Sequence, residues 1–73
     1  KVIQWAKEKD IVKPSNIYKQ TLKFGEEAGE VAGAVLSGDK DEIRLEIGDV
    51  MVTLTILSAQ SGLTLSECFD AAE

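Results

Sequence analysis

The fold is decided by one stretch of the sequence, DKDEIRLEIGDVMVTLTILSAQ at residues 39–60. Its second half, residues 50–57, is rich in β-branched side chains and is compatible with a buried strand. Five apolar residues nevertheless recur at helical spacing and share one arc of a helical projection: Ile43, Ile47, Val50, Leu54 and Leu57. No partner strand is evident elsewhere in the sequence. We therefore predict a helix over residues 40–61, of modest intrinsic propensity and held by packing.

Three breaks in the apolar pattern divide the chain into helices. Pro14 lies in a polar connector, Gly38 follows a helical pattern, and Gly62 follows the stretch quoted above. Asp39 and Thr64 each have a glutamate three positions later, which is typical of a helix N-terminus. We therefore predict four helices, at residues 1–9, 16–37, 40–61 and 64–73.

Composition limits the chemistry that the chain can perform. The 73 residues are 44% hydrophobic and 29% charged, which is the balance of one small globular domain. There is no histidine and one cysteine, Cys68. His-dependent nucleophilic sites, His-containing metal sites and an internal disulfide are therefore excluded, and the lone thiol fits a reducing compartment.

Charge and hydropathy indicate the partners to expect. The formal net charge of −5 argues against a basic nucleic-acid-binding face. No apolar run approaches the roughly 20 residues of a membrane span. We predict a cytoplasmic protein that binds neither nucleic acid nor membranes. Because the chain stops at Glu73 without a helix cap, we expect residues 1–73 to be one domain that is truncated at its C-terminal end.

The predicted helix 40–61 carries a narrow acidic stripe between two apolar faces. The stripe consists of Glu42, Glu46, Asp49 and Thr53. One flank is the apolar arc named above, and the opposite flank consists of Leu45, Val52 and Ile56. A helix that is apolar almost all round is buried, and an ionised carboxylate that is buried without a partner is strongly unfavourable. We therefore expect something cationic to meet the stripe.

The predicted helix 16–37 offers complementary acids. Glu27 and Glu30 are i, i+3 neighbours, as are Glu46 and Asp49, so each pair can converge on one point. A short turn at Gly38 would bring the two pairs face to face. Four carboxylates without histidine or cysteine nearby describe an all-oxygen site for a hard cation, Mg²⁺ or alternatively Mn²⁺.

A simpler interpretation remains open for the acids of the first helix. Lys19 and Lys23 can neutralise Glu26, Glu27 and Glu30 as ordinary surface pairs. The core stripe that we predict for this helix is Ile17, Thr21, Phe24, Ala28, Val31, Ala32 and Val35. Only the stripe between two apolar faces on the second helix favours the metal site over surface pairing.

Two segments together carry a family resemblance, KFGEEAGEV at residues 23–31 and EIGDV at residues 46–50. They resemble the EExxE and ExxD signature of MazG-like nucleoside triphosphate pyrophosphohydrolases, which belong to the all-α NTP pyrophosphatase superfamily. The resemblance implies Mg²⁺-dependent hydrolysis of an NTP or dNTP to the monophosphate and pyrophosphate. It also implies an all-α fold, an antiparallel helical bundle of about four helices per chain that is completed by oligomerisation as a dimer or tetramer.

The same resemblance assigns roles to individual residues. By position, the metal-binding carboxylates are Glu27, Glu30, Glu46 and Asp49. Glu26 matches the first acid of the motif, as an outer ligand or as the base for the attacking water, so Glu26 and Glu27 are the candidate catalytic residues.

Substrate contacts are expected outside the motif acids. Gln20 faces the same side of its helix as Glu27, and Lys23 precedes the motif. Trp5 is a candidate for stacking on the nucleobase, with a core position as the alternative. The sequence departs from relatives at Leu45, where many have an acid, and nothing basic follows Arg44. We expect further phosphate-binding cations to lie past residue 73 or in a partner subunit.

The two apolar faces of helix 40–61 predict a homo-oligomer. Helix 16–37 can cover only one of them, and a monomer would expose the other as a patch of the kind that marks an interface. Two other functions remain open. One is a catalytically silent helical module for oligomerisation or partner binding, and the other is a nucleotide- or metal-binding regulator that keeps the acids without turnover.

Overall fold

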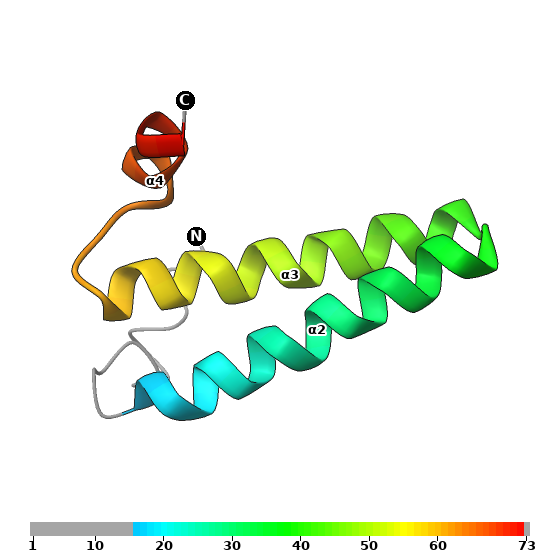
Figure 1. Cartoon of the computed structure of the whole chain (residues 1–73), viewed down its shortest axis with the longest axis horizontal. Coiled ribbons are helices and arrows are strands. Elements are labelled where there is room, and N and C mark those ends of the chain that lie inside the picture. Colours follow the sequence, from blue (N-terminus) through cyan, green and yellow to red (C-terminus); the bar gives the residue numbers. More distant parts are fainter. Residues whose placement is uncertain (1–15, 73) are drawn as a thin grey trace.

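The computed structural model describes residues 16–72, which form three helices (Figure 1). Helix α2 spans Ile17–Ser37, α3 spans Lys40–Gln60 and α4 spans Leu65–Ala72. Helices α2 and α3 form an antiparallel hairpin, and α4 follows a short connection and contacts α3. No strand occurs in this part of the chain, so residues 50–57 are helical as predicted. The all-α prediction is confirmed, whereas the predicted helix at residues 1–9, with Trp5, lies outside the described residues.

The turn between α2 and α3 is fixed by backbone chemistry. Gly38 has φ 78°, in the left-handed region that favours glycine, and its N–H donates to the carbonyls of Ala34 and Val35. Asp39 then caps α3, because its Oδ1 accepts from the N–H groups of Asp41 at 3.0 Å and Glu42 at 3.3 Å. The hairpin therefore forms where the sequence places its glycine and its N-cap.

The connection from α3 to α4 also consists of a glycine with positive φ and a helix cap. Gly62 has φ 76°, again in the left-handed region that favours glycine. The Thr64 N–H donates to Glu67 Oε1 at 2.7 Å, and the Glu67 N–H donates to Thr64 Oγ1 at 3.2 Å. This reciprocal pair is the capping box that the spacing predicted.

The contact between α2 and α3 is centred on the acidic stripe and includes Ile56 from the apolar flank beside it. Glu27, Thr53 and Ile56 are only 6%, 4% and 3% exposed. Leu45 and Ile47, from opposite apolar faces of α3, are 62% and 44% exposed. The sequence predicted that the first helix can cover only one of the two apolar faces. The first helix packs between them, buries Ile56 and leaves part of each face exposed.

The rotation of α2 about its own axis also differs from the prediction. The predicted core stripe is only partly covered, because Thr21, Ala32 and Val35 are exposed. Glu27 and Ala34, seven positions apart, are the buried residues of this helix. A carboxylate thus takes the place in the helix contact that an apolar side chain normally occupies.

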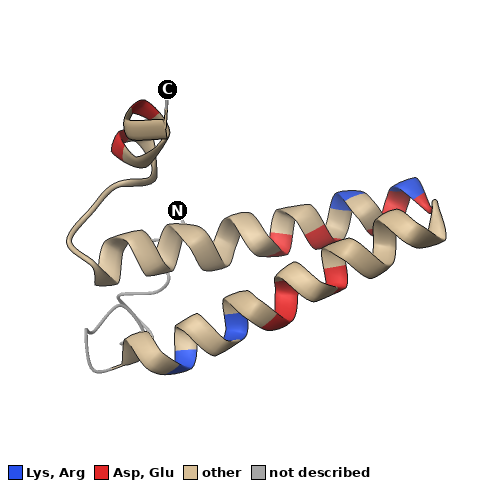
Figure 2. Ribbon diagram, in the orientation of Figure 1, with Lys and Arg blue, Asp and Glu red and all other residues tan. Residues whose placement is uncertain are grey.

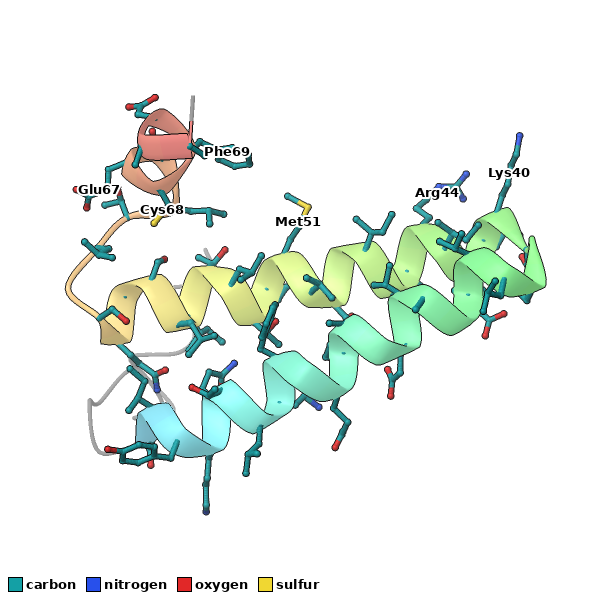
Figure 3. All side chains as sticks on the ribbon, viewed as in Figure 1. Lys40, Arg44, Met51, Glu67, Cys68 and Phe69 are labelled. Carbon is teal, nitrogen blue, oxygen red and sulfur yellow. The ribbon has the colours of Figure 1, made fainter. Side chains whose placement is uncertain are left out.

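The outer side of α3 is open. Lys40, Arg44 and Met51 point away from α2 (Figure 3), and Met51 is 53% exposed. Among the described residues, the buried hydrophobic side chains are Ala34 and Ile56, and no large side chain is fully buried. No described helix combines the length and apolar character needed to cross a membrane.

Removing the cap of α3 tests the hairpin. Asp39→Ala should lower the free energy of unfolding by about 1 kcal/mol, because two N–H groups lose their acceptor. Asp39→Asn keeps the acceptor and should stay within a few tenths of a kcal/mol of the parent chain. Urea denaturation at one fixed protein concentration measures both values. Equal losses in the two variants would show that the cap does not contribute.

Candidate metal centre

The acids of α2 and α3 meet halfway along the hairpin. Figure 2 shows their red bands on neighbouring turns of the two helices. Carboxylate oxygens of Glu27, Glu46 and Asp49 lie within 4.8 Å of one another, although these residues come from different helices. Oxygens of Glu26, Glu27 and Glu30 form a second such group along α2. Glu27 belongs to both groups. We call the five residues of the two groups together the acid cluster: Glu26, Glu27, Glu30, Glu46 and Asp49.

Glu27 is the most buried member of the acid cluster. Its side chain is 8% exposed, and its Oε1 lies 3.4 Å from Lys23 Nζ. Its other oxygen, Oε2, is buried and accepts no hydrogen bond from the described part of the chain. A carboxylate oxygen that is withdrawn from water without a partner carries a large desolvation penalty. This oxygen therefore favours a bound cation beside Glu27.

The raised pKa of Glu46 reflects how closely the acids approach one another. A hydrogen bond with the Glu30 side chain raises the pKa of Glu46 to about 7. Partial burial and repulsion by Glu30, Asp49 and Glu27 raise the pKa of Glu46 in the same direction. Two carboxyl groups share a hydrogen bond only when one of them is protonated. Without a cation, Glu46 therefore keeps its proton to a higher pH than an ordinary glutamate, up to its pKa of about 7.

The four carboxylates predicted to bind metal are therefore brought together, two from each helix. The donor set is entirely oxygen, which suits Mg²⁺ or Mn²⁺ and not a softer ion. Glu26 differs from the other acids, because it is exposed and its oxygens group only with those of Glu27 and Glu30. It lies at the edge of the acid cluster, beside water.

A hollow of about 420 Å³ adjoins the acid cluster. Gln20 and Lys23, both predicted to contact substrate, line it. The sequence predicted no substrate contact for the five other lining residues, which are Asn16, Lys19, Val52, Thr53 and Ile56. Helical spacing could have indicated two of these residues. Lys19 lies one turn before Lys23, and Thr53 lies one turn after Asp49, so each shares a helix face with a predicted site residue.

The raised pKa of Glu46 predicts a pH dependence of stability. The pKa rises from 4.5 to about 7 on folding, so the folded state keeps a proton that the unfolded state loses. In the metal-free chain, stability should therefore fall as pH rises from 4.5 towards about 7, and should level off above that. Glu46→Gln removes this titration and should flatten the decline in Tm. Parallel Tm profiles for the variant and the parent, measured with a chelator present, would contradict the shared proton.

Comparison with known proteins finds one matching family and similar sequences. Residues 16–72 match the model of the MazG nucleotide pyrophosphohydrolase domain. An uncharacterised 18.2 kDa protein of Haemophilus phage HP1 is 38% identical over 58 residues, which cover 80% of this chain and 36% of the phage protein. The histidine biosynthesis bifunctional protein HisIE of Thermotoga maritima is 44% identical over 49 residues, which cover 67% of this chain and 25% of that protein.

These relatives are considerably longer than the chain, which spans about a third of one and a quarter of the other. No solved structure matches the chain. The family match nevertheless extends over all the described residues, and it includes both acidic motifs and the turn between them. On this basis, the chain belongs to the MazG nucleotide pyrophosphohydrolase domain family.

Proposed function

We propose that the chain is a Mg²⁺-dependent nucleoside triphosphate pyrophosphohydrolase that converts an NTP or dNTP to the monophosphate and pyrophosphate. One observation carries this proposal. Carboxylates from both helices converge on a point where a buried oxygen of Glu27 lacks a partner. Membership of the MazG family supports the reaction class. We place residues 1–73 in a single domain of this kind.

Four residues would hold the metal, namely Glu27, Glu30, Glu46 and Asp49. A bound Mg²⁺ would neutralise phosphate charge and lower the pKa of the attacking water. The exposed carboxylate of Glu26, at the edge of the acid cluster, is the candidate base that takes a proton from that water. The water oxygen bonds to the α-phosphorus, the bond from that phosphorus to the bridging oxygen breaks, and pyrophosphate leaves. No covalent nucleophile is needed.

The hollow beside the acid cluster is the proposed substrate site. Lys23 lies between the two, because it lines the hollow and also pairs with Glu27. Its ammonium group would neutralise a phosphate, while the Gln20 amide would orient the nucleotide. The apolar side chains of Val52 and Ile56 line the same hollow and suit a sugar or base. A nucleotide substrate and a reduced Cys68 both fit the cytoplasm, which we propose as the location.

The metal site predicts a linkage between Mg²⁺ and stability. Relief of repulsion in the acid cluster should raise Tm by about 10–20 °C at a Mg²⁺ concentration 100 times Kd. Asp49→Asn should abolish most of this gain, and it should raise Tm without metal because one negative charge is removed. Asp70→Asn, on the exposed face of α4, is the matched control and should keep the full response. An undiminished Mg²⁺ response in Asp49→Asn would remove this residue from the site.

Substitution of Glu26 should lower activity without weakening metal binding. Glu26→Gln should keep the Mg²⁺-dependent gain in Tm but lower kcat by about 10²–10⁴-fold, the usual effect of losing a general base. Phosphate release coupled to inorganic pyrophosphatase, measured across a panel of NTPs and dNTPs, gives kcat and KM. Omitting the pyrophosphatase controls for direct phosphate release. A parent chain that binds Mg²⁺ but hydrolyses no nucleotide would favour the regulatory alternative.

A further inference from the structure

The hollow beside the acid cluster holds two of the four cations among the described residues. These cations are Lys19, Lys23, Lys40 and Arg44, and the first two line the hollow. Figure 2 shows the blue bands of α2 in its first half, before the red bands. None of the described residues that line the hollow is acidic, although the chain carries a net charge of −5. The hollow is therefore a basic surface on an acidic protein.

Lys19 makes no ion pair with the described residues. Lys23 pairs with Glu27, and the other ion pair in this part of the chain lies at the start of α3. The surface pairing that the sequence left open for Lys19 thus does not form here. Its exposed ammonium group has three donors and no acceptor, and it is open to a ligand in the hollow.

The register of the hairpin places Lys19 far from the acid cluster. Glu27 lies beside Asp49 across the contact. In an antiparallel pair, each step towards the start of α2 corresponds to an equal step towards the end of α3. Gln20 lies seven positions before Glu27, and Ile56 lies seven positions after Asp49. Gln20 and Ile56 are therefore level with each other. Lys19 directly precedes Gln20, about 12 Å along the helix axis from Glu27.

The α3 side of the hollow is apolar at this end. Val52 and Ile56 are one turn apart and line it together, and Ile56 is only 3% exposed. A phosphate group against these side chains would lose water without gaining a partner there. A planar nucleobase would instead bury its face on them and leave its edge to the polar side chains of α2. The far end of the hollow therefore suits the base, whereas Lys23, nearer the acid cluster, suits a phosphate.

The polar side chains at this end favour hydrogen-bond acceptors on the base. The Gln20 amide both donates and accepts, so it adapts to either kind of edge, whereas Lys19 can only donate. A keto oxygen, as in uracil, thymine, guanine or hypoxanthine, accepts from the ammonium group. An amino group in the same place, as in cytosine or adenine, sets a donor against a donor. For the same reason, lysine is a common partner of the guanine O6 and N7 acceptors in DNA recognition.

We infer that Lys19 is a specificity-determining residue, and that it selects nucleotides whose base carries a keto group where cytosine or adenine carries an amino group. Lys19 acts in this way on the substrate of the proposed function, so the inference rests on that function. It names the class of base that the hollow accepts.

Matched pairs of substrates test the preference. UTP and CTP differ in the group at C4 of the base, and ITP and ATP differ in the group at C6, with keto replacing amino in each pair. The parent chain should have a kcat/KM about tenfold higher for the keto member, the effect of one hydrogen bond to a charged group. A parent chain that hydrolyses both members equally well would overturn the inference.

Substitutions of Lys19 test whether this residue is the cause. Lys19→Met should bring the keto-to-amino ratio of kcat/KM close to one, and Lys19→Glu, which only accepts, should reverse the preference. Lys40→Met is the matched control and should keep the parent ratio, because Lys40 is an exposed lysine that points away from α2 (Figure 3). A phosphate contact by Lys19 would instead make Lys19→Met lower kcat/KM equally for all nucleotides. The unchanged ratio would then overturn the inference.

Binding without turnover separates the inference from the proposed function. The α,β-methylene analogues of UTP and CTP replace the bridging oxygen of the bond that would break, so calorimetry in Mg²⁺ measures their Kd without hydrolysis. The parent chain should bind the UTP analogue about tenfold more tightly than the CTP analogue, and Lys19→Met should bind both equally. A preference in binding without hydrolysis of any nucleotide would support the role of Lys19 and contradict the proposed reaction. Hydrolysis without a preference would support the reaction and overturn the role of Lys19.

Discussion

The burial of carboxylates between α2 and α3 is the constraint on which the rest of the structure depends. Glu27 is 6% exposed and sits where two helices normally exchange apolar side chains. Charges in such a place are unfavourable unless protons, ammonium groups or metal ions neutralise them. Two of these solutions are available within the described residues: the raised pKa of Glu46 favours its protonated form beside Glu30, and the Lys23 ammonium group lies beside Glu27. The third is the divalent cation that the family uses and that the donor set suits.

Placing the acids inside moves the apolar residues outside. The hairpin buries Ala34 and Ile56, whereas Leu22 and Leu36 remain almost fully exposed. A helix pair with so little apolar surface at its contact has a weak driving force for folding on its own. Neutralisation of the carboxylates on the inner face of the hairpin is therefore a condition for its stability, and the Lys23 ammonium group supplies part of it beside Glu27.

The sequence predicts the helices well because their signals are local. Gly38 and Asp39 mark the end of one helix and the cap of the next, and Thr64 and Glu67 mark the start of α4. The convergence of Glu27 with Asp49 also follows from spacing. Each helix carries an i, i+3 pair of acids, and the short turn between the helices leaves few other ways to arrange these pairs. The predicted core stripe of α2 is only partly buried, because hydrophobic projection assumes that apolar side chains meet across the contact. Here the Glu27 carboxylate takes that place, and Glu46 and Asp49 of α3 lie beside it.

The pair between Lys23 and Glu27 has a consequence for the order of binding. The Lys23 side chain is 56% exposed and borders the hollow, so its ammonium group is held at the acid cluster by the attraction of one carboxylate oxygen 3.4 Å away. A divalent cation held by the Glu27 carboxylate, as the proposed function requires, would compete with Lys23 for that carboxylate. The Lys23 ammonium group would then be available to an anion in the hollow. Under that proposal the metal and a phosphate would each strengthen the binding of the other.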